Sequence, residues 1–167
     1  MTKSSLTHFE AEISSARAAE PLPDGSLDFV HYKAVHHHLF QDVYEWAGQV
    51  RTVRISKGGN PFCFPENIEG QANQLFDDLR MSDYLRNLDS EPFSVNAAHF
   101  LAELNAIHAF REGNGRSQFT FLALLADFAG HQLNIEKLNP HEMLVAMIAS
   151  FDGNERELAQ IINDLVD

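Results

Sequence analysis

Apolar residues recur at spacings of three and four along most of the chain, which predicts a protein built from helices. A first helix is expected near residues 5–19, and the proline-rich run 21–25 ends it. A second helix is expected from Asp28 to Gly48, with its apolar positions facing a core. Further helices are expected near 67–80, briefly near 82–87, from Pro92 to His108, from Ser117 to Ala129, and after Pro140 with a break near 152–154.

One segment departs from this helical pattern. Residues 50–55 alternate with a period of two, and the turn-forming run 58–61 separates them from the short apolar run 62–64. Alternation bounded by glycine and proline predicts a β-hairpin. No repeat or linker divides the 167 residues, a length typical of one domain. We therefore expect residues 1–167 to form a single all-α domain, a helical bundle with one small hairpin.

The composition limits the classes of function. The chain has 12 basic and 24 acidic residues, a formal net charge of −12, which argues against direct nucleic-acid binding over a broad surface. Cys63 is the only cysteine, so no intramolecular disulfide is expected. No apolar run approaches the roughly 20 residues of a membrane span, and the N-terminus lacks the apolar segment of a secretory signal. We expect a cytoplasmic protein without membrane contact; secretion by a specialised system stays open.

Residues 108–116, which read His-Ala-Phe-Arg-Glu-Gly-Asn-Gly-Arg, join two predicted helices. Gly113 and Gly115 can turn backbone N–H groups toward an anion at the start of the second helix. An arginine adds a fork of donors for phosphate oxygens. A carboxylate fits such a site when a divalent cation separates it from the phosphates, so Glu112 is the expected metal ligand. His108, with an ordinary pKa of about 6.5, is the expected proton acceptor.

The remaining histidines invite a metal assignment that their spacing does not support. Adjacent helical residues point about 100° apart, so the run 36–38 cannot converge on one ion and is expected to be packed or solvated. His108 and Glu112 lie four residues apart, as zinc ligands on a helix do, but the nearby glycines favour a loop. The other candidates have no shared spacing and are interpreted as structural: His31, His99, His131 and His141.

The stretch resembles the signature loop of the Fic family, H-x-F-x-[D/E]-G-N-G-R-x-x-R, and matches each specified position from His108 to Arg116. The final arginine of the pattern is Phe119 here. The segments 32–36, 39–48 and 51–58 are also similar to the residues that precede the signature in the family. The resemblance implies a Fic-type bundle whose hairpin is a flap over the active site. Such a flap aligns an extended piece of a target protein by main-chain pairing.

The resemblance implies a protein adenylyltransferase. A hydroxyl of the target protein attacks the α-phosphorus of ATP, the base accepts its proton, pyrophosphate leaves, and AMP remains on the target. The loop N–H groups and the Asn114 amide are implied to stabilise the developing charge. Phe62 and Phe64 of the flap are further candidates for contact with the target or the base. The implied site comprises His108 as the base, Glu112 as the Mg²⁺ ligand, and Gly113, Asn114, Gly115, Arg116 and Lys57 as nucleotide-binding residues.

Two alternatives to AMP transfer stay open. Relatives of the Doc type transfer a terminal phosphate and carry Ala and Lys where this chain has Gly113 and Gly115, so the glycines favour AMP transfer. A catalytically weak nucleotide-binding module is the second alternative, and Phe119 favours it. In the family the missing arginine resembles a ligand of the γ-phosphate.

The resemblance also bears on regulation. Fic proteins are often inhibited by a helix with the motif [S/T]-x-x-x-E-[G/N], but no Ser or Thr of this chain has Glu four residues later. The chain therefore resembles a toxin restrained by a small separate antitoxin protein. Stand-alone bacterial members of the family resemble toxins that modify type II topoisomerases, which makes a topoisomerase subunit the implied target. The acceptor residue type stays open.

Overall fold

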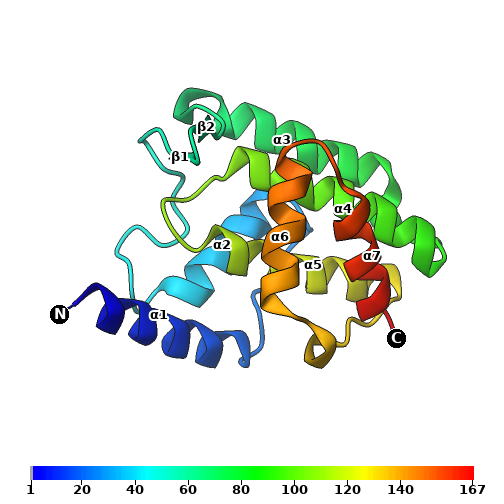
Figure 1. The fold of residues 1–167 in the computed structure, drawn as a ribbon, viewed down its shortest axis with the longest axis horizontal. Helices are drawn as coiled ribbons and strands as arrows, with labels where there is room; N and C mark the ends of the chain where they lie inside the picture. Colours follow the sequence, from blue (N-terminus) through cyan, green and yellow to red (C-terminus); the bar gives the residue numbers. More distant parts are fainter. Residues whose placement is uncertain (1) are drawn as a thin grey trace.

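The computed structural model describes residues 2–167 and confirms a bundle of helices with one small two-stranded sheet (Figure 1). The elements are α1 (Lys3–Ala18), α2 (Phe29–Phe40), β1 (Ser56–Lys57), β2 (Asn60–Pro61), α3 (Pro65–Met81), the 3-10 helix η1 (Asp83–Leu85), α4 (Ser90–Ile107), α5 (Asn114–Ala129), the 3-10 helix η2 (Ile135–Lys137), α6 (Pro140–Phe151) and α7 (Arg156–Leu165). Asp28 begins α2 as predicted, because its carboxylate accepts a hydrogen bond from the His31 N–H at 2.8 Å. Asn139 caps α6 in the same way, and Pro140 occupies the first helical position.

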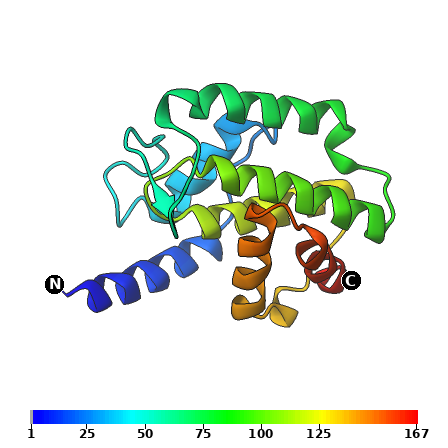
Figure 2. The same ribbon diagram turned by 45° about the horizontal axis from the view of Figure 1, so that its top comes forward.

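Helix α4 lies at the centre of the bundle and packs against α3, α5, α6 and α7. Helix α2 packs against α1 and α5. Figure 2 shows α6, in orange, running across the direction of α4, in green. Between the helices an aromatic cluster forms the core; Tyr32, for example, lies 5.4 Å from Phe110 and 5.7 Å from Phe121 between ring centroids. Because Phe110 is completely buried, it anchors the segment between α4 and α5 in this core.

Helix α5 is buried along most of its length, as its apolar sequence predicts. Its exposed residues lie near its two ends: Gly115, Arg116, Asp127 and Phe128. Gly130 ends the helix in a left-handed conformation with φ 93°. Among the helices of residues 2–167, none has both the length and the apolar content needed to cross a membrane.

The predicted extension of the second helix to Gly48 is wrong, because α2 ends at Phe40 and turns follow. The rings of Tyr44 and Trp46 stack with 4.3 Å between centroids. In a continuous helix two such residues would point about 200° apart. The spacing of three and four therefore continues into a segment that folds back over α2, and Gly48 takes φ 82° at its end.

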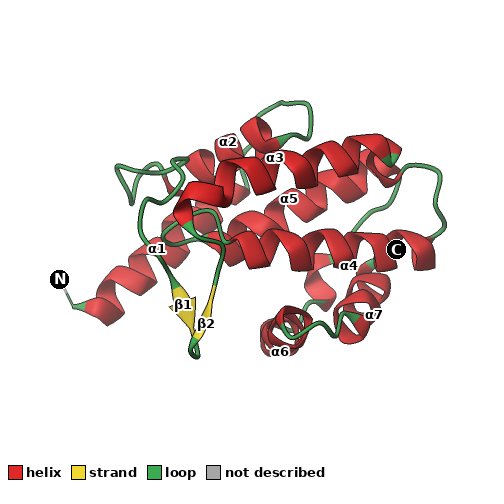
Figure 3. Ribbon diagram, turned by 90° about the horizontal axis from the view of Figure 1, so that it is seen from above, coloured by secondary structure: helices red, strands yellow, loops and turns green. Residues whose placement is uncertain are grey.

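The hairpin exists, but the predicted strands at 50–55 and 62–64 are wrong. The strands are the two-residue β1 and β2, with Lys57 opposite Asn60, and one further hydrogen bond joins the Phe62 N–H to the Ile55 carbonyl at 3.0 Å. Residues farther from the turn bond elsewhere: the Arg51 N–H donates to the Ala109 carbonyl at 3.0 Å and the Cys63 N–H to the Ala106 carbonyl at 3.1 Å. The alternating residues thus connect the hairpin to the end of α4. In Figure 3 the hairpin projects from the bundle on the side where α6 lies.

Candidate active site

The loop between α4 and α5 contains two residues in the left-handed conformation. His108 ends α4 with φ 50° and ψ 62°, and Gly113 precedes α5 with φ 81°. A Cβ atom at Gly113 would lie 2.4 Å from Cε2 of Phe40, so the site requires glycine. This turn leads directly into the first turn of α5, whose free N–H groups and positive dipole end attract anions.

The imidazole of His108 stacks on Phe62, with 3.8 Å between centroids and 7° between the ring planes. Burial lowers the pKa of His108 to about 4; the Asn105 carbonyl opposes this shift, and the positive charges of Arg51 and Lys57 add to it. Within residues 2–167 the enclosed Nδ1 atom has no hydrogen-bond partner. The ring is therefore neutral near pH 7 and able to accept a proton.

Arg51 holds the backbone around His108, although the sequence analysis assigned it no role. Its side chain is 2% exposed and donates to the carbonyls of His108 at 2.7 Å, Ile107 at 3.2 Å and Val53 at 2.7 Å, and also to that of Cys63. The cation lies at the C-terminal end of α4, where the helix dipole is negative. Arg51 thus joins the base of the hairpin to the end of α4. A basic residue in an alternating segment was the only signal in the sequence.

Two further side chains hold the loop itself. The His36 ring accepts a hydrogen bond from the Gly48 N–H at 2.9 Å and, through Nε2, contacts the Glu112 carbonyl at 2.9 Å. Asn114 is 3% exposed; its Oδ1 accepts from the Phe110 N–H at 3.0 Å, and its Nδ2 donates to the Phe110 carbonyl at 2.7 Å. The Asn114 amide is therefore occupied by the loop, which favours a positioning role over direct contact with a phosphate.

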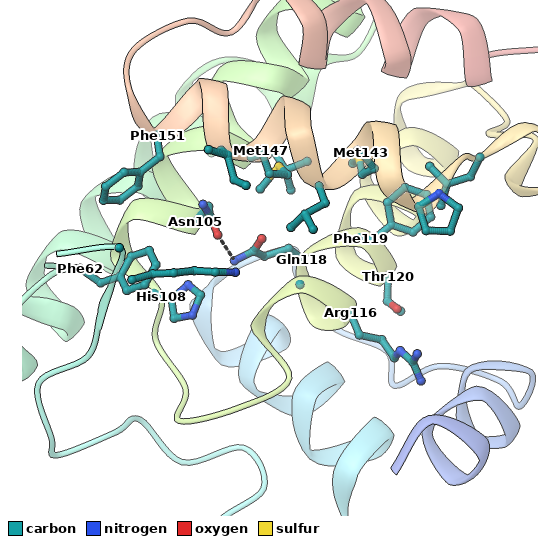
Figure 4. A pocket seen from close by; sticks show the side chains of 18 of the residues that line it. Phe62, Asn105, His108, Arg116, Gln118, Phe119, Thr120, Met143, Met147 and Phe151 are labelled. Atoms are coloured by element: carbon teal, nitrogen blue, oxygen red, sulfur yellow. Dashed lines mark hydrogen bonds between the residues drawn. The ribbon is translucent and has the colours of Figure 1, made fainter. Parts of the chain in front are cut away.

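A pocket of about 810 Å³ lies between the hairpin, α5 and α6, and His108 lines it (Figure 4). Phe62 of the hairpin closes one side, and Met143 and Met147 of α6 form another. Gln118 of α5 lies between these walls. The pocket is mostly apolar with a few polar groups, as sites for small organic ligands are. The α6 residues and Gln118 were not predicted to be part of the site, because their apolar neighbours indicated core.

Several residues expected in the site line this pocket. They are Lys57, His108, Gly115 and Arg116. At Gly115 an added Cβ would meet no atom of residues 2–167 within 4 Å, so the fold itself does not require glycine there. Glycine in a helix costs roughly 0.5–1 kcal/mol relative to alanine. Open space beside this glycine suits a ligand that approaches the helix backbone closely.

Glu112 is exposed on the loop and is not among the residues that line the pocket. Within residues 2–167 no group of three or more His, Cys, Asp or Glu side chains could hold a metal ion. Mg²⁺ in nucleotide sites is commonly held by one or two carboxylates, several waters and the phosphates of the substrate. A single exposed carboxylate beside the anion-binding turn fits this chemistry, and His36 keeps its backbone in place.

Arg116 is turned toward α1. Its Nη1 donates to the Ala11 carbonyl at 3.1 Å and to the hydroxyl of Ser15 at 3.4 Å, and it also contacts the hydroxyl of Ser14. These partners are neutral, so a phosphate would be a stronger partner for the guanidinium. The contact links the N-terminal helix to the start of α5.

Phe119 lies between the core and the pocket. Its half-buried side chain packs against the hydrophobic core and also lines the pocket. Phe62 and Phe64, the two flap aromatics, differ in their environments. Phe62 is 7% exposed against His108, whereas Phe64 is 40% exposed under the Arg54 guanidinium, 4.3 Å from its ring centroid.

The histidine run bonds to backbone groups. His36 is completely buried and contacts the Glu112 carbonyl, His37 contacts the Ala47 carbonyl at 3.0 Å, and His38 contacts the Arg17 carbonyl at 2.7 Å. The three rings thus point to different parts of the chain, as the angular argument predicts. His31 and His131 likewise contact the carbonyls of Pro23 and Leu88.

Comparison with known proteins adds independent findings. The family model described as the Fic/DOC family matches residues 26–126. The chain is 52% identical over 162 residues to "Probable protein adenylyltransferase y4lH" of Sinorhizobium fredii, covering 96% of this chain and 84% of that protein. It is 41% identical over 138 residues to "Protein adenylyltransferase VbhT" of Bartonella schoenbuchensis, covering 83% of this chain and 29% of that protein. The solved structure of BepC from Bartonella tribocorum with bound AMPPNP is similar at a TM-score of 0.87 and 25% identity, covering 99% of this chain and 88% of that chain.

Proposed function

Since the chain belongs to the Fic/DOC family, we propose that it transfers AMP from ATP to a side-chain hydroxyl of a target protein. The observation that carries this proposal is the neutral, enclosed imidazole of His108 beside the anion-attracting start of α5. Relatives named as protein adenylyltransferases and a similar structure with bound AMPPNP support the same activity.

The proposed reaction uses these groups as follows. The target oxygen attacks the α-phosphorus as its proton passes to Nε2 of His108. The new phosphorus–oxygen bond joins AMP to the target, and the bond between the α- and β-phosphates breaks to release pyrophosphate. The free N–H groups at the start of α5 and the Arg116 guanidinium are suited to bind the phosphates. The negative charge of bound phosphates favours the protonated imidazole. Nucleotide binding would therefore raise the pKa of His108 from about 4 toward its ordinary value.

The hairpin supplies a surface for the target. All four strand residues are exposed, so the backbone edges of β1 and β2 are accessible to an extended segment. Strand addition uses main-chain hydrogen bonds and leaves the approaching side chain free to point toward the base. Lys57 lies both in β1 and at the pocket, where its charge can contact either the nucleotide or the target.

Transfer chemistry is tested with ATP labelled separately at the α- and γ-phosphates, incubated with the purified chain and a cell extract. We expect the α-label on a protein. A protein carrying the γ-label indicates phosphate transfer of the Doc type instead. Label on neither indicates a module that binds nucleotide without transfer.

Replacement of His108 tests its role as the base. His108→Ala is expected to lower α-label transfer by about 10²–10⁴-fold, the usual contribution of a general base, while ATP binding is retained. Because His108 has φ 50°, His108→Asn is the matched variant: asparagine tolerates this conformation but does not act as a base near pH 7. Calorimetric ATP titration and thermal melting accompany the transfer assay. Parent-like transfer by either variant would remove His108 from the mechanism.

Glu112 is the residue that we propose to hold Mg²⁺, which neutralises phosphate charge when bound. Glu112→Gln keeps the side-chain size but removes the charge, so we expect ADP binding to need several-fold more magnesium for half saturation. Calorimetric titration of ADP at graded magnesium concentrations measures this without transfer. Glu103→Gln, on the exposed side of α4, is the control. An unchanged magnesium midpoint in Glu112→Gln argues against the assignment.

The biological role follows from the same resemblance. We infer a cytoplasmic toxin that modifies a type II topoisomerase subunit and is restrained by a small antitoxin protein. The absence of the inhibitory motif from this sequence supports restraint by a separate chain. Expression of the parent should arrest bacterial growth and place α-label on the topoisomerase subunit, whereas His108→Ala should do neither. Unimpaired growth with the active parent contradicts the toxin role.

A further inference from the structure

Gln118 is a buried polar residue in the wall of the pocket. It is 2% exposed, and its Nε2 atom donates to Oδ1 of Asn105 at 3.3 Å. Its Oε1 atom is enclosed and accepts no hydrogen bond from any group of residues 2–167. Figure 4 shows this oxygen on the side facing Met147, while the nitrogen points to Asn105. The free acceptor thus lies within the wall that Gln118 contributes to the pocket, on the side away from Asn105.

Apolar side chains form much of the pocket around Gln118. Phe119, Met143 and Met147 lie near it in Figure 4, and Leu101 of α4 also lines the pocket, together with polar residues such as His108 and Thr120. An amide oxygen that loses water without gaining a partner destabilises the fold, so such atoms are rare in buried positions. A few placed polar groups among apolar walls are how small-molecule sites orient their ligands. The bond to Asn105 fixes the orientation of the amide, with its nitrogen toward Asn105 and its oxygen on the opposite side.

Ser117, the residue before Gln118, is also buried and polar but lies away from the pocket. Ser117 is completely buried, and its hydroxyl also has no partner within the described part of the chain. Unlike Gln118, it is not among the residues that line the pocket. Because Ser117 does not line the pocket, a ligand bound there would not contact its hydroxyl. Ser117 is therefore a matched control for the loss of a buried polar group on the same turn of α5.

We infer that Gln118 determines nucleotide specificity, with Oε1 accepting a hydrogen bond from a donor on the nucleoside. This inference rests on the proposed function, because it takes ATP as the ligand. Phosphate oxygens are acceptors themselves and belong at the N–H groups of α5 rather than beside a carbonyl oxygen. Adenosine offers two kinds of donor, the exocyclic amine of the base and the ribose hydroxyls. The apolar walls beside Gln118 suit a base or sugar better than a charged group.

Binding of ATP analogues tests this without any transfer reaction. The probes are ATP, purine riboside triphosphate, which lacks the amine, and the 2′-deoxy and 3′-deoxy forms of ATP. We expect the parent to bind one of the analogues about tenfold more weakly than ATP. A weaker purine riboside triphosphate assigns the contact to the base, and a weaker deoxy form assigns it to the ribose. Equal affinity for all four probes overturns the inference, and this comparison needs no variant.

Gln118→Met keeps the length of the side chain and removes the acceptor. We expect it to bind ATP about tenfold more weakly than the parent and to lose the discrimination among the probes. Ser117→Ala should retain the parent's affinity and discrimination. A folded Gln118→Met, verified by thermal melting, that still discriminates like the parent overturns the inference.

The outcomes separate this inference from the proposed function. A parent that binds no adenine nucleotide overturns both. ATP binding without discrimination overturns only the role of Gln118. Discrimination that depends on Gln118, in a protein that transfers no α-label, supports the specificity role and contradicts AMP transfer.

Discussion

Phe119 is the position at which this chain departs from the family signature. Its position in the signature is occupied by arginine in the family pattern, and a phenyl ring offers no donor to a phosphate. The side chain is half-buried between core and pocket, so a longer polar side chain could reach the pocket without losing all its water. The substitution therefore changes ligand contacts more than it changes the core.

Phe119→Arg is expected to tighten ATP binding about tenfold while ADP binding changes little, because a charge-assisted hydrogen bond contributes about 1.5–3 kcal/mol when well formed. Calorimetric titration with both nucleotides measures the difference, and thermal melting monitors the fold. Phe128→Arg, on the exposed end of the same helix, controls for added charge. A melting temperature far below that of the control would instead place the guanidinium in the core, where an unpaired charge costs several kcal/mol.

At the scale of elements, the flap is stabilised mainly through its base. Two-residue strands are marginal by themselves. Phe62 is buried against His108 and makes an edge contact with Phe151 of α6, with 5.2 Å between the ring centroids. Its N–H also donates to the Ile55 carbonyl at 3.0 Å. The Phe62 side chain thus anchors the flap, covers the His108 ring and contacts the opposite wall of the pocket.

Phe62→Ala is expected to raise the pKa of His108 from about 4 toward its ordinary value near 6.5, because the ring that excludes water from the imidazole is removed. Removal of a buried phenyl ring also costs about 3 kcal/mol of folding stability. An NMR titration of the His108 ring protons follows the pKa. Phe64→Ala, which removes an exposed ring of the same flap, should leave it unchanged. An unmoved His108 pKa in Phe62→Ala would show that other groups keep the imidazole neutral.

At the scale of the whole molecule, buried polar side chains hold the site by joining distant segments. Arg51 connects the base of the flap with the end of α4, and His36 connects α2 with the loop before α5. Burial lowers the pKa of His36 to about 4. Its ring is therefore neutral in the folded protein over a pH range in which the unfolded chain protonates it. Burial likewise lowers the pKa of His108.

Acidification is therefore expected to destabilise the protein between about pH 6.5 and pH 4. In this window the unfolded state binds more protons than the folded state, so the free energy of unfolding falls as pH falls and is unaffected by these rings above pH 7. The contribution of His36 is about 3 kcal/mol at pH 4. Urea unfolding of the parent and of His36→Gln at several pH values isolates the contribution of His36. The carboxylates of the two proteins are the same, so their effects cancel when one free energy of unfolding is subtracted from the other. Parallel pH profiles for the two proteins would contradict this role.

Much of the fold could be read from local patterns. Asp28 and Pro140 identified the starts of α2 and α6, and Gly113 and Gly115 marked the junction between α4 and α5. The errors arose where local spacing is ambiguous. Residues 41–48 keep a helical spacing while folding back. Residues 50–55 alternate without forming a strand, because the Arg51 N–H bonds to the Ala109 carbonyl after α4 and only Ile55 bonds across the hairpin.

The sequence by itself identified the loop from His108 to Arg116 as the candidate site, since two glycines, a histidine and a carboxylate lie close together in it. Only the tertiary structure decided which other groups serve that loop. Arg51 bonds to a carbonyl 57 positions away, and His36 to one 76 positions away. Gln118 looks like part of a core helix until α6 and the flap enclose the pocket around it. Such contacts depend on how helices pack, and packing distances are not encoded in the periodicity of any one segment.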